Sequence, residues 1–340
     1  MKEAQFYKKL EEQKVQCQAC NHYCQISPGR RGICSVRRNI DGTLYSLVYG
    51  KVIAKNIDPI EKKPLFHFLP GTKSLSIATV GCNFRCLYCQ NADIAQMPKE
   101  SDLREENVPG QDMTPEEVVS EALLSGAPSI SYTYSEPTIF IEFALETMKL
   151  ARKNNLKNVW VSNGYTSREV LTEAIPYLDA VNIDLKGFTE KFYYTVCGAK
   201  LKPVLQTLKI IKQGGVWVEV TTLVVPGGND TAEHFEGIAN FIAKELGRET
   251  PWHISKFFPT YRLRDLPPTP PSSLIEAREV GKRSGLKYVY LDNVALPEYE
   301  TTFCPKCGVK MVERHGYEIV RHDKNGKCAK CGEDLNLILK

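Results

Sequence analysis

The sequence predicts an α/β protein whose main body is a partial, TIM-like (β/α)6 barrel, flanked by an N-terminal four-cysteine module and a C-terminal zinc ribbon. One observation behind this is that short apolar segments alternate with helical patterns, at the spacing of parallel βαβ units. The other is that the twelve cysteines form one central group and two end groups, with a single cysteine apart. The groups divide the chain into residues 1–70, 71–297 and 298–340.

Seven apolar segments of the main body have the length and composition of buried strands. They are Leu75–Val80, Ser129–Tyr134, Asn158–Ser162, Ala180–Asp184, Val216–Val225, Trp252–Phe257 and Lys287–Leu291. Five helical patterns lie among them, and the first opens with a capping box and an early proline in Thr114-Pro115-Glu116-Glu117. The helices are expected at 114–124, 138–154, 167–178, 202–213 and 231–246. The proline-rich segment 266–271 must be a loop, because proline removes backbone donors.

Composition excludes several classes of protein. Of the 340 residues 42% are hydrophobic and 25% are charged, which is typical of a globular protein and not of a disordered, collagenous or coiled-coil one. No apolar run approaches the roughly 18 residues of a membrane span. The first residues lack the apolar segment of a secretory signal, so we expect a cytoplasmic protein. The net charge of +4 is too small to indicate a nucleic-acid partner.

Polar residues and glycines follow one predicted strand after another. Cys82 follows the first strand, Ser135 and Glu136 the second, and Asn163 the third, while Asp184 ends the fourth. Every βα turn uses such residues for conformational reasons, so one turn alone indicates little. In barrels of this class, however, the chemistry lies at the carboxyl ends of the strands. The sequence therefore predicts an active site at that edge of the sheet.

The central cysteines are Cys82, Cys86 and Cys89, three thiols within eight residues. A closed [4Fe–4S] site uses four cysteines. Three thiolates would leave one iron open to a substrate or cofactor, as in open catalytic metal sites. The alternatives are three buried cysteines, or a zinc site that lacks one ligand.

The spacing Cys-x3-Cys-x2-Cys, with Tyr88 before the last cysteine, resembles the signature of the radical S-adenosylmethionine (SAM) superfamily. The segment 134–137, Tyr-Ser-Glu-Pro, stands where that superfamily has its Gly-Gly-Glu motif. Segments 161–165 and 182–186 resemble the matching parts of pyruvate formate-lyase activating enzymes. Together with the end cysteines and the string Asp58–Phe68, they make the whole chain resemble the radical enzyme of the AmmeMemoRadiSam system.

The resemblance implies a [4Fe–4S] cluster and S-adenosylmethionine as cofactors. It implies reductive cleavage of S-adenosylmethionine to a 5′-deoxyadenosyl radical, which abstracts hydrogen from a substrate that the sequence does not identify. An electron donor such as flavodoxin or ferredoxin would be required. The implied cofactor-binding residues are Tyr88, Ser135, Glu136, Ser162, Asn163, Asp184 and Lys186. Of these, Glu136 suits the ammonium group, Lys186 a carboxylate or ribose oxygen, and Tyr88 the adenine.

Three positions depart from the activating enzymes. Val161 replaces an acidic residue, Thr221 replaces an arginine, and Tyr134-Ser135 replaces Gly-Gly. No residue is assigned to hydrogen transfer from the substrate. The candidates near the strand ends, each expected to be structural more often than catalytic, are His67, Tyr132, Thr133, Glu219, His253 and Tyr261. Cys197 could form a thiyl radical, although a small buried residue is the simpler interpretation.

Each end of the chain has its own cysteine group. Cys304, Cys307, Cys328 and Cys331 form two Cys-x2-Cys pairs, which suit a closed Zn–S4 site. Metal binding would then supply much of the folding free energy of this short tail. The front group, Cys17, Cys20, Cys24 and Cys34, is expected to hold zinc, with a second iron–sulfur cluster or unligated thiols as the alternatives, and His22 could replace one cysteine.

Other functions are compatible with parts of the sequence. The chain could be a glycyl-radical enzyme activase, a zinc-ribbon protein that binds nucleic acid, or an iron–sulfur electron carrier. The absence of a basic, aromatic stripe disfavours nucleic acid. An electron carrier would be expected to provide a protein ligand for each of the four irons of its cluster. Whether the substrate is a small molecule or a protein is left open, and no membrane partner is expected.

Overall fold

The computed structural model describes residues 1–101, 107–294 and 296–340. Its main sheet has eight strands in the order β16-β15-β14-β13-β12-β11-β9-β8, of which β9 and β11 to β16 are parallel and β8 is antiparallel to β9. The strands are β8 (Ala54–Pro59), β9 (Lys73–Ala78), β11 (Ser129–Tyr132), β12 (Lys157–Ser162), β13 (Ala180–Asp184), β14 (Trp217–Val224), β15 (Trp252–Lys256) and β16 (Val289–Asp292). The sheet stays open, so the prediction of a partial α/β barrel is confirmed.

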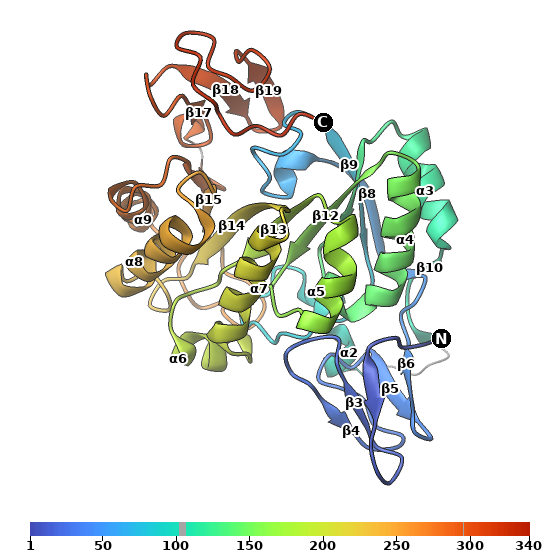
Figure 1. Cartoon of the computed structure of the whole chain (residues 1–340). Coiled ribbons are helices and arrows are strands. Elements are labelled where there is room, and N and C mark those ends of the chain that lie inside the picture. The colour runs from blue at the N-terminus through green and yellow to red at the C-terminus, as the bar shows by residue number, and fades with distance from the viewer. Residues whose placement is uncertain (102–106, 295) are drawn as a thin grey trace.

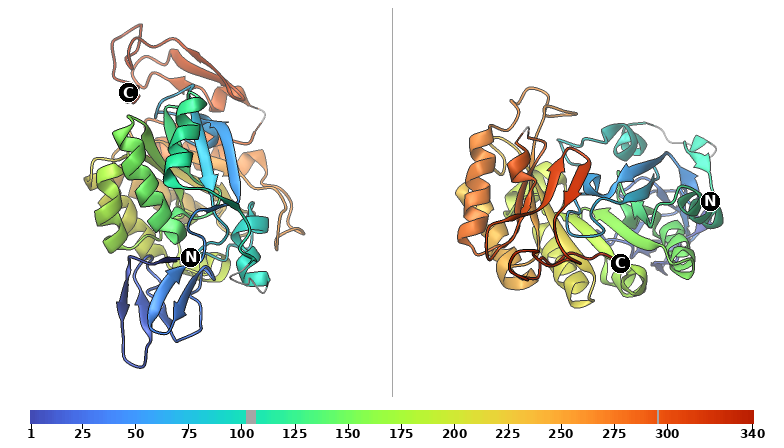
Figure 2. Two further views of the ribbon diagram at one scale, coloured as in Figure 1. Left: turned by 90° about the vertical axis from the view of Figure 1, so that its right-hand side faces the viewer. Right: turned by 90° about the horizontal axis from the view of Figure 1, so that it is seen from above.

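The helices pack along one face of this sheet (Figure 2). They are α3 (Pro115–Leu124), α4 (Ile141–Lys153), α5 (Arg168–Ala174), α7 (Leu201–Gln213), α8 (Ala232–Phe241) and α9 (Pro271–Arg283). The capping box at Thr114 is present, with hydrogen bonds in both directions between Thr114 and Glu117. The second predicted helix begins instead as a 3-10 turn, Pro137–Phe140, because Glu136 caps Thr138 ahead of α4.

Short helical pieces complete the crossovers. They are the 3-10 turns Ile60–Lys62, Ile175–Tyr177 and Pro297–Tyr299, the short helices α1 (Ala92–Ala95), α2 (Met97–Glu100) and α6 (Glu190–Phe192), and the π-helical turns Tyr193–Cys197 and Ile242–Leu246. The sequence did not predict α9. It begins at Pro271, where a proline suits the first position of a helix because that N–H needs no partner.

The N-terminal and C-terminal parts lie at opposite ends of the main body (Figure 1). The front has two three-stranded sheets, β1-β6-β5 and β2-β3-β4, and the pair β10-β7. These strands are β1 (Lys2–Glu3), β2 (Tyr7–Lys9), β3 (Val15–Cys17), β4 (Gln25–Ile26), β5 (Arg37–Ile40), β6 (Thr43–Ser46), β7 (Lys51–Val52) and β10 (Gln111–Asp112). The tail is the sheet of β17 (Thr302–Phe303), β18 (Lys310–His315) and β19 (Glu318–Arg321). The domain boundaries at 70 and 297 stay a prediction.

The tail docks on the segment that follows β8. Arg314 of β18 is fully buried, donates to the carbonyl oxygen of Phe66 at 2.7 Å, and lies 4.0 Å from the centre of the Phe66 ring. The backbone of His67 accepts a hydrogen bond from Ile338, and Leu69 donates one to Ile338. The string Asp58–Phe68 therefore joins the tail to the main sheet.

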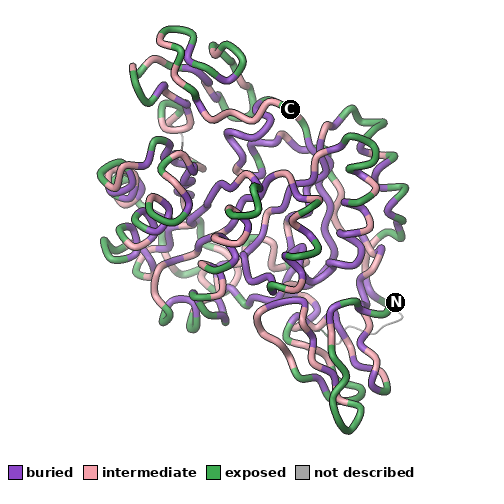
Figure 3. Tube along the Cα trace, viewed as in Figure 1, coloured by how far each residue is buried: buried purple, intermediate pink, exposed green. Residues whose placement is uncertain are grey.

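The buried residues concentrate in the strands of the main sheet and the inward faces of the helices (Figure 3). Runs such as β11 and β13 are apolar or buried along almost their whole length, as expected for parallel strands covered on both faces. Within the described residues, no helix combines the length and apolarity needed to cross a bilayer.

Candidate functional site

A cavity of about 760 Å³ lies at the carboxyl ends of the main strands. Its lining includes all three central cysteines and every residue that the sequence analysis proposed for the cofactor. Those lining residues are Cys82, Cys86, Tyr88, Cys89, Ser135, Glu136, Ser162, Asn163, Asp184 and Lys186. The tail contributes Gly316 and Tyr317 to the same cavity. The fold thus brings together residues that are spread over more than 230 positions of the sequence.

The cysteine loop is held from behind by backbone contacts. Gly81 has φ +102°, and a Cβ atom there would lie 2.7 Å from a methyl group of Val36, so a side chain would clash. The amide of Arg85 donates to the carbonyl oxygen of Cys197, and that of Leu87 donates to Val196. These bonds fix the loop while its thiols line the cavity.

The three thiols fit a bound cluster. The amide of Phe84 points at Cys82 Sγ at 3.4 Å, and Asn163 Nδ2 lies 3.7 Å from the same sulfur. Burial raises the pKa of Cys82, so its thiolate needs nearby positive charge. Cysteine thiolates are the ligands of iron–sulfur clusters, and all three central thiols line the cavity.

Cys197 lies behind the loop and does not line the cavity. It is fully buried, and its sulfur is 3.8 Å from the hydroxyl of Tyr88. It also neighbours the thiol of Cys86. This position agrees with a packing role better than with a radical exposed to a substrate.

Glu136 is the most firmly held carboxylate of the cavity. Its Oε1 accepts from the Thr138 hydroxyl at 2.6 Å and from Ser162 Oγ at 2.8 Å, and its Oε2 accepts from the amide of Asn163 at 2.9 Å. Burial raises the pKa of Glu136, and these donors oppose the rise. Since a carboxylate oxygen accepts more than one hydrogen bond, Oε2 retains capacity for a donor from the cavity.

Asp184 and Lys186 form an ion pair at the end of β13. Lys186 Nζ lies 3.0 Å from Asp184 Oδ2 and 5.8 Å from the centre of the Tyr88 ring. Ser135 is buried, and its hydroxyl has no partner among the described residues. These side chains form a polar wall next to the cysteine loop.

Tyr134 occupies a backbone conformation that favours glycine. Its φ is +61°, in the left-handed region. Among the contacts that hold the strained residue, its hydroxyl donates to Asp58, its carbonyl oxygen accepts from Asn91 at 2.8 Å, and Lys63 Nζ lies 4.4 Å from its ring centre. Asp58 also accepts from Lys62 at 2.9 Å and from Lys63 at 2.6 Å. No pattern in the sequence indicates this link between the segment Asp58–Phe68 and the second predicted strand.

Of the candidates near the strand ends, Thr133 lines the cavity and the others lie elsewhere. Tyr132 is buried and donates to Asn158 at 3.2 Å, and Tyr261 is half-buried beside Glu100. His67 bonds to the hydroxyl of Tyr290 at 2.7 Å and contacts the carbonyl oxygen of Leu335 at 3.1 Å. These contacts are structural.

Glu219 and His253 form a buried pair below the cavity. His253 Nε2 lies 2.7 Å from Glu219 Oε2, and Nδ1 lies 3.3 Å from Asp292 Oδ2. Burial alone would lower the pKa of His253, but Asp292 and Glu219 outweigh burial and raise it to about 9. The imidazole is therefore protonated at neutral pH.

The His253 pair predicts a dependence of stability on pH. Because the pKa is near 6.5 in the unfolded chain and about 9 in the folded protein, the folded state binds more protons between these values. The stabilisation is complete below pH 6.5 and is lost as the pH rises to 9, by on the order of 3 kcal/mol at most. We expect His253→Asn to flatten the fall in unfolding free energy between pH 6.5 and 9. Urea denaturation at several pH values measures the unfolding free energy of both proteins. An equal dependence of that free energy on pH in the two proteins would contradict this.

The tail cysteines converge as tightly as a zinc site requires. The four sulfurs lie within 4.8 Å of one another, with Cys304–Cys331 and Cys307–Cys328 at 3.6 Å. At a Zn–S distance of about 2.3 Å, a tetrahedron places its sulfurs about 3.8 Å apart. The group is therefore compatible with a zinc ribbon.

The front cysteines line a small cavity together with His22, Thr138 and Ile139. Among the described residues they do not form a group as tight as the tail cysteines, so their metal stays open between zinc and iron–sulfur. The site adjoins the main cavity: His22 Nε2 is 2.9 Å from the carbonyl oxygen of Asn83, and Thr138 also bonds to Glu136.

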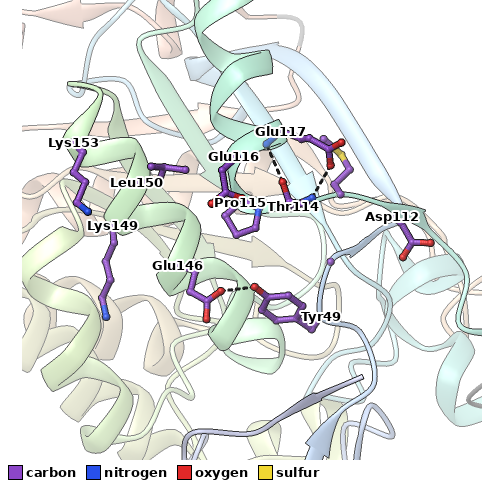
Figure 4. A pocket seen from close by; sticks show the side chains of 12 residues that line it. Tyr49, Asp112, Thr114, Pro115, Glu116, Glu117, Glu146, Lys149, Leu150 and Lys153 are labelled. Atoms are coloured by element: carbon purple, nitrogen blue, oxygen red, sulfur yellow. Dashed lines mark hydrogen bonds between the residues drawn. The ribbon is translucent and has the colours of Figure 1, made fainter.

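A second cavity, of about 860 Å³, lies where Tyr49 and the start of α3 meet α4 (Figure 4). In its lining Tyr49 donates to Glu146, and Thr114 and Glu117 form the capping box of α3. No buried, unpartnered side-chain atom of the described residues belongs to its lining. We therefore place the chemistry in the first cavity.

The chain is similar to proteins of the radical SAM superfamily. The Radical SAM superfamily model matches residues 76–242, which include the cysteine loop. An uncharacterised protein of Methanocaldococcus jannaschii is 48% identical over the full length of both chains. The pyruvate formate-lyase-activating enzyme of Clostridium pasteurianum is 25% identical over 64% of this chain and 90% of its own. A domain of such an enzyme from Bacteroides vulgatus matches 48% of this chain and 98% of its own, with 15% identity and a TM-score of 0.42.

Proposed function

The chain belongs to the radical SAM superfamily, and on that premise we propose that it cleaves S-adenosylmethionine reductively at a [4Fe–4S] cluster held by Cys82, Cys86 and Cys89. The observation that carries the proposal is that these thiols and the predicted cofactor residues line one cavity. When bound, such a cluster supplies one electron to the sulfonium, and the 5′-deoxyadenosyl radical that results abstracts a hydrogen atom from the substrate.

The residues of this chain bind and orient the cofactor. Glu136 offers Oε2 to the ammonium group, and the Ser135 hydroxyl is free to bond beside it. Lys186 can donate to the carboxylate or a ribose oxygen of S-adenosylmethionine, and it forms an ion pair with Asp184. The ring of Tyr88 provides an apolar surface for the adenine. The cavity wall of β11 to β13 keeps the reacting atoms away from bulk water.

The direct test uses protein reconstituted anaerobically with iron and sulfide. With dithionite and S-adenosylmethionine, we expect 5′-deoxyadenosine and methionine in equal amounts, measured by mass spectrometry. Protein that carries the cluster but forms neither product would contradict the proposal.

A matched pair of variants tests the ammonium site. Glu136→Gln removes the negative charge, so we expect the affinity for S-adenosylmethionine to fall about tenfold, near 1.4 kcal/mol. Glu61→Gln is the control, because Glu61 is also a buried carboxylate of this cavity and bonds to Gly71 instead. Equilibrium dialysis with the oxidised holoprotein measures both, and circular dichroism checks folding. Equal affinities for S-adenosylmethionine in the two variants would show that Glu136 does not bind the ammonium group.

A second candidate is activation of a glycyl-radical enzyme. The relatives include a putative glycyl-radical enzyme activating enzyme of Methanocaldococcus jannaschii, 28% identical over 69% of this chain. A protein substrate and a protein reductant, such as flavodoxin or ferredoxin, follow from that relation. The departures at Val161 and Thr221 separate this chain from the activating enzymes. Transfer of deuterium into 5′-deoxyadenosine from a labelled protein, or from a labelled small molecule, distinguishes these two classes of substrate.

The two metal centres at the ends complete the proposal. We assign structural zinc to the tail cysteines, and to the front cysteines one metal centre that supports the wall of the cavity. The membership of the AmmeMemoRadiSam subfamily and a cytoplasmic location stay predictions.

A further inference from the structure

The cavity extends well beyond the residues assigned to the cofactor. Its lining continues across the sheet to Thr221 on β14, Ser255 on β15 and Asp292 on β16, which is the edge strand opposite to β8. The cysteines follow β9, near the other edge. The end of the cavity formed by β13 to β16 is therefore the part left for a substrate.

Two buried side chains at this end have polar atoms without a partner. Asn182 is fully buried, and its Nδ2 donates to the carbonyl oxygen of Pro64 at 2.7 Å, which fixes the amide orientation. Its Oδ1 makes no hydrogen bond. Thr221 is 7% exposed, and its hydroxyl has no partner among the described residues. A buried acceptor that stays unpaired costs about 1–3 kcal/mol, so these atoms point to a polar ligand.

Asp292 adds a carboxylate to the same end. Both of its oxygens are buried without a hydrogen bond, although Oδ2 lies 3.3 Å from His253 Nδ1. His253 is shared with Glu219, so one cation stands between two carboxylates. Glu300 also lines the cavity, and burial together with Asp292 raises its pKa to about 7.

The lysines of the cavity already have carboxylate partners. Lys62 and Lys63 both pair with Asp58, and Lys186 pairs with Asp184. The nearby Arg314 donates to backbone carbonyls and to Thr302 behind Phe66, and it does not line the cavity. The end of the cavity formed by β13 to β16 therefore offers acceptors without a partner among the described residues, together with the carboxylate of Asp292.

From these observations we propose that Asn182, Thr221 and Asp292 bind a positively charged, hydrogen-bond-donating group of the substrate, of the alkylammonium type. The inference rests on the proposed function and deepens it, because it names the chemical class that enters the cofactor cavity. An ammonium group only donates hydrogen bonds, so it suits an amide oxygen, a hydroxyl oxygen and a carboxylate, whereas the Asp292 carboxylate would repel a carboxylate or phosphate.

The probes are three four-carbon compounds of matched length: putrescine, 1,4-butanediol and succinate. They are titrated calorimetrically into the reconstituted full-length protein with saturating S-adenosylmethionine and no reductant. We expect putrescine to bind saturably and at least tenfold more tightly than butanediol, and succinate not to bind. Preference for succinate, or equal binding of putrescine and butanediol, would overturn the proposal.

Variants locate the binding. Asp292→Asn and Thr221→Val should each weaken putrescine binding at least tenfold. Asp112→Asn should leave it unchanged, since Asp112 is an exposed partner of Lys51 in the other cavity. Thr221→Val keeps the side-chain shape and still tests the site should Asp292→Asn fail to fold. Unchanged binding in a folded Thr221→Val protein, or loss of binding in Asp112→Asn, would contradict the assignment.

Two measurements separate this inference from the proposed function. Displacement of putrescine by S-adenosylmethionine would show that the acceptors belong to the cofactor, and would overturn the substrate assignment alone. Formation of 5′-deoxyadenosine by the wild-type protein without any amine is measured in parallel. Product without selective putrescine binding defeats only the inference, and absence of product from cluster-bearing protein defeats the proposed function.

Discussion

Replacement of Cys86 by serine is expected to abolish cluster binding and to lower 5′-deoxyadenosine formation at least a hundredfold. A serine hydroxyl does not ionise near neutral pH, so one of the three proposed ligands would be lost. Because Cys86 is buried at the wall of the cavity, no exposed group can replace it. Iron content, visible absorbance and product yield after reconstitution measure the loss.

Cys197→Ser is the matched control for this experiment. Cys197 is equally buried and neighbours Cys86, but it lies outside the signature and does not line the cavity. We expect Cys197→Ser to keep the full iron content and the reaction. Loss of the cluster in both variants would mean that four cysteines cap all the irons, and the open position would not exist.

Replacement of Cys328 by serine should unfold the tail. The apolar core of the tail is small and consists of Met311 and Leu335 with two of the cysteines, Cys304 and Cys328. A structural zinc contributes about 10–16 kcal/mol of apparent binding free energy in small zinc domains. Without a fourth thiolate we expect the loss of one zinc per chain and of amide protection in β18, measured by metal analysis and hydrogen exchange.

A histidine of the tail, His322, serves as the control for this experiment. His322 lies in the tail but contacts Glu313 at 2.9 Å and not the cysteines. His322→Gln should keep both zinc and protection. The docking of Arg314 on Phe66 also predicts that loss of the tail raises hydrogen exchange in the segment after β8. Retained zinc in Cys328→Ser would contradict the Zn–S4 assignment.

The strands of the main sheet could be predicted from sequence because they are buried apolar runs. The predicted range for β13 matches the observed strand, and the others differ by a few residues at their ends. By contrast, β8 was missed, because Ala54–Pro59 is polar and half exposed, and only its antiparallel pairing with β9 makes it a strand. The helix α9 was missed because prolines obscured its start.

The cofactor residues could be predicted because they follow the strands directly and match a known signature. The substrate end could not. Whether Asn182 Oδ1 or the Thr221 hydroxyl lacks a partner depends on contacts with residues far away in the sequence, such as Pro64. The same holds for Tyr134, whose strain is supported by Asp58 and Lys63 of another segment.

The account depends on three cysteines leaving one metal position of the cavity open. Mössbauer spectroscopy of protein reconstituted with 57Fe tests this directly, with and without S-adenosylmethionine. We predict that one iron in four changes its spectrum when S-adenosylmethionine is added, and that Cys197→Ser behaves in the same way. Four irons whose spectra stay unchanged on addition, or a loop that takes up only zinc, would contradict the account.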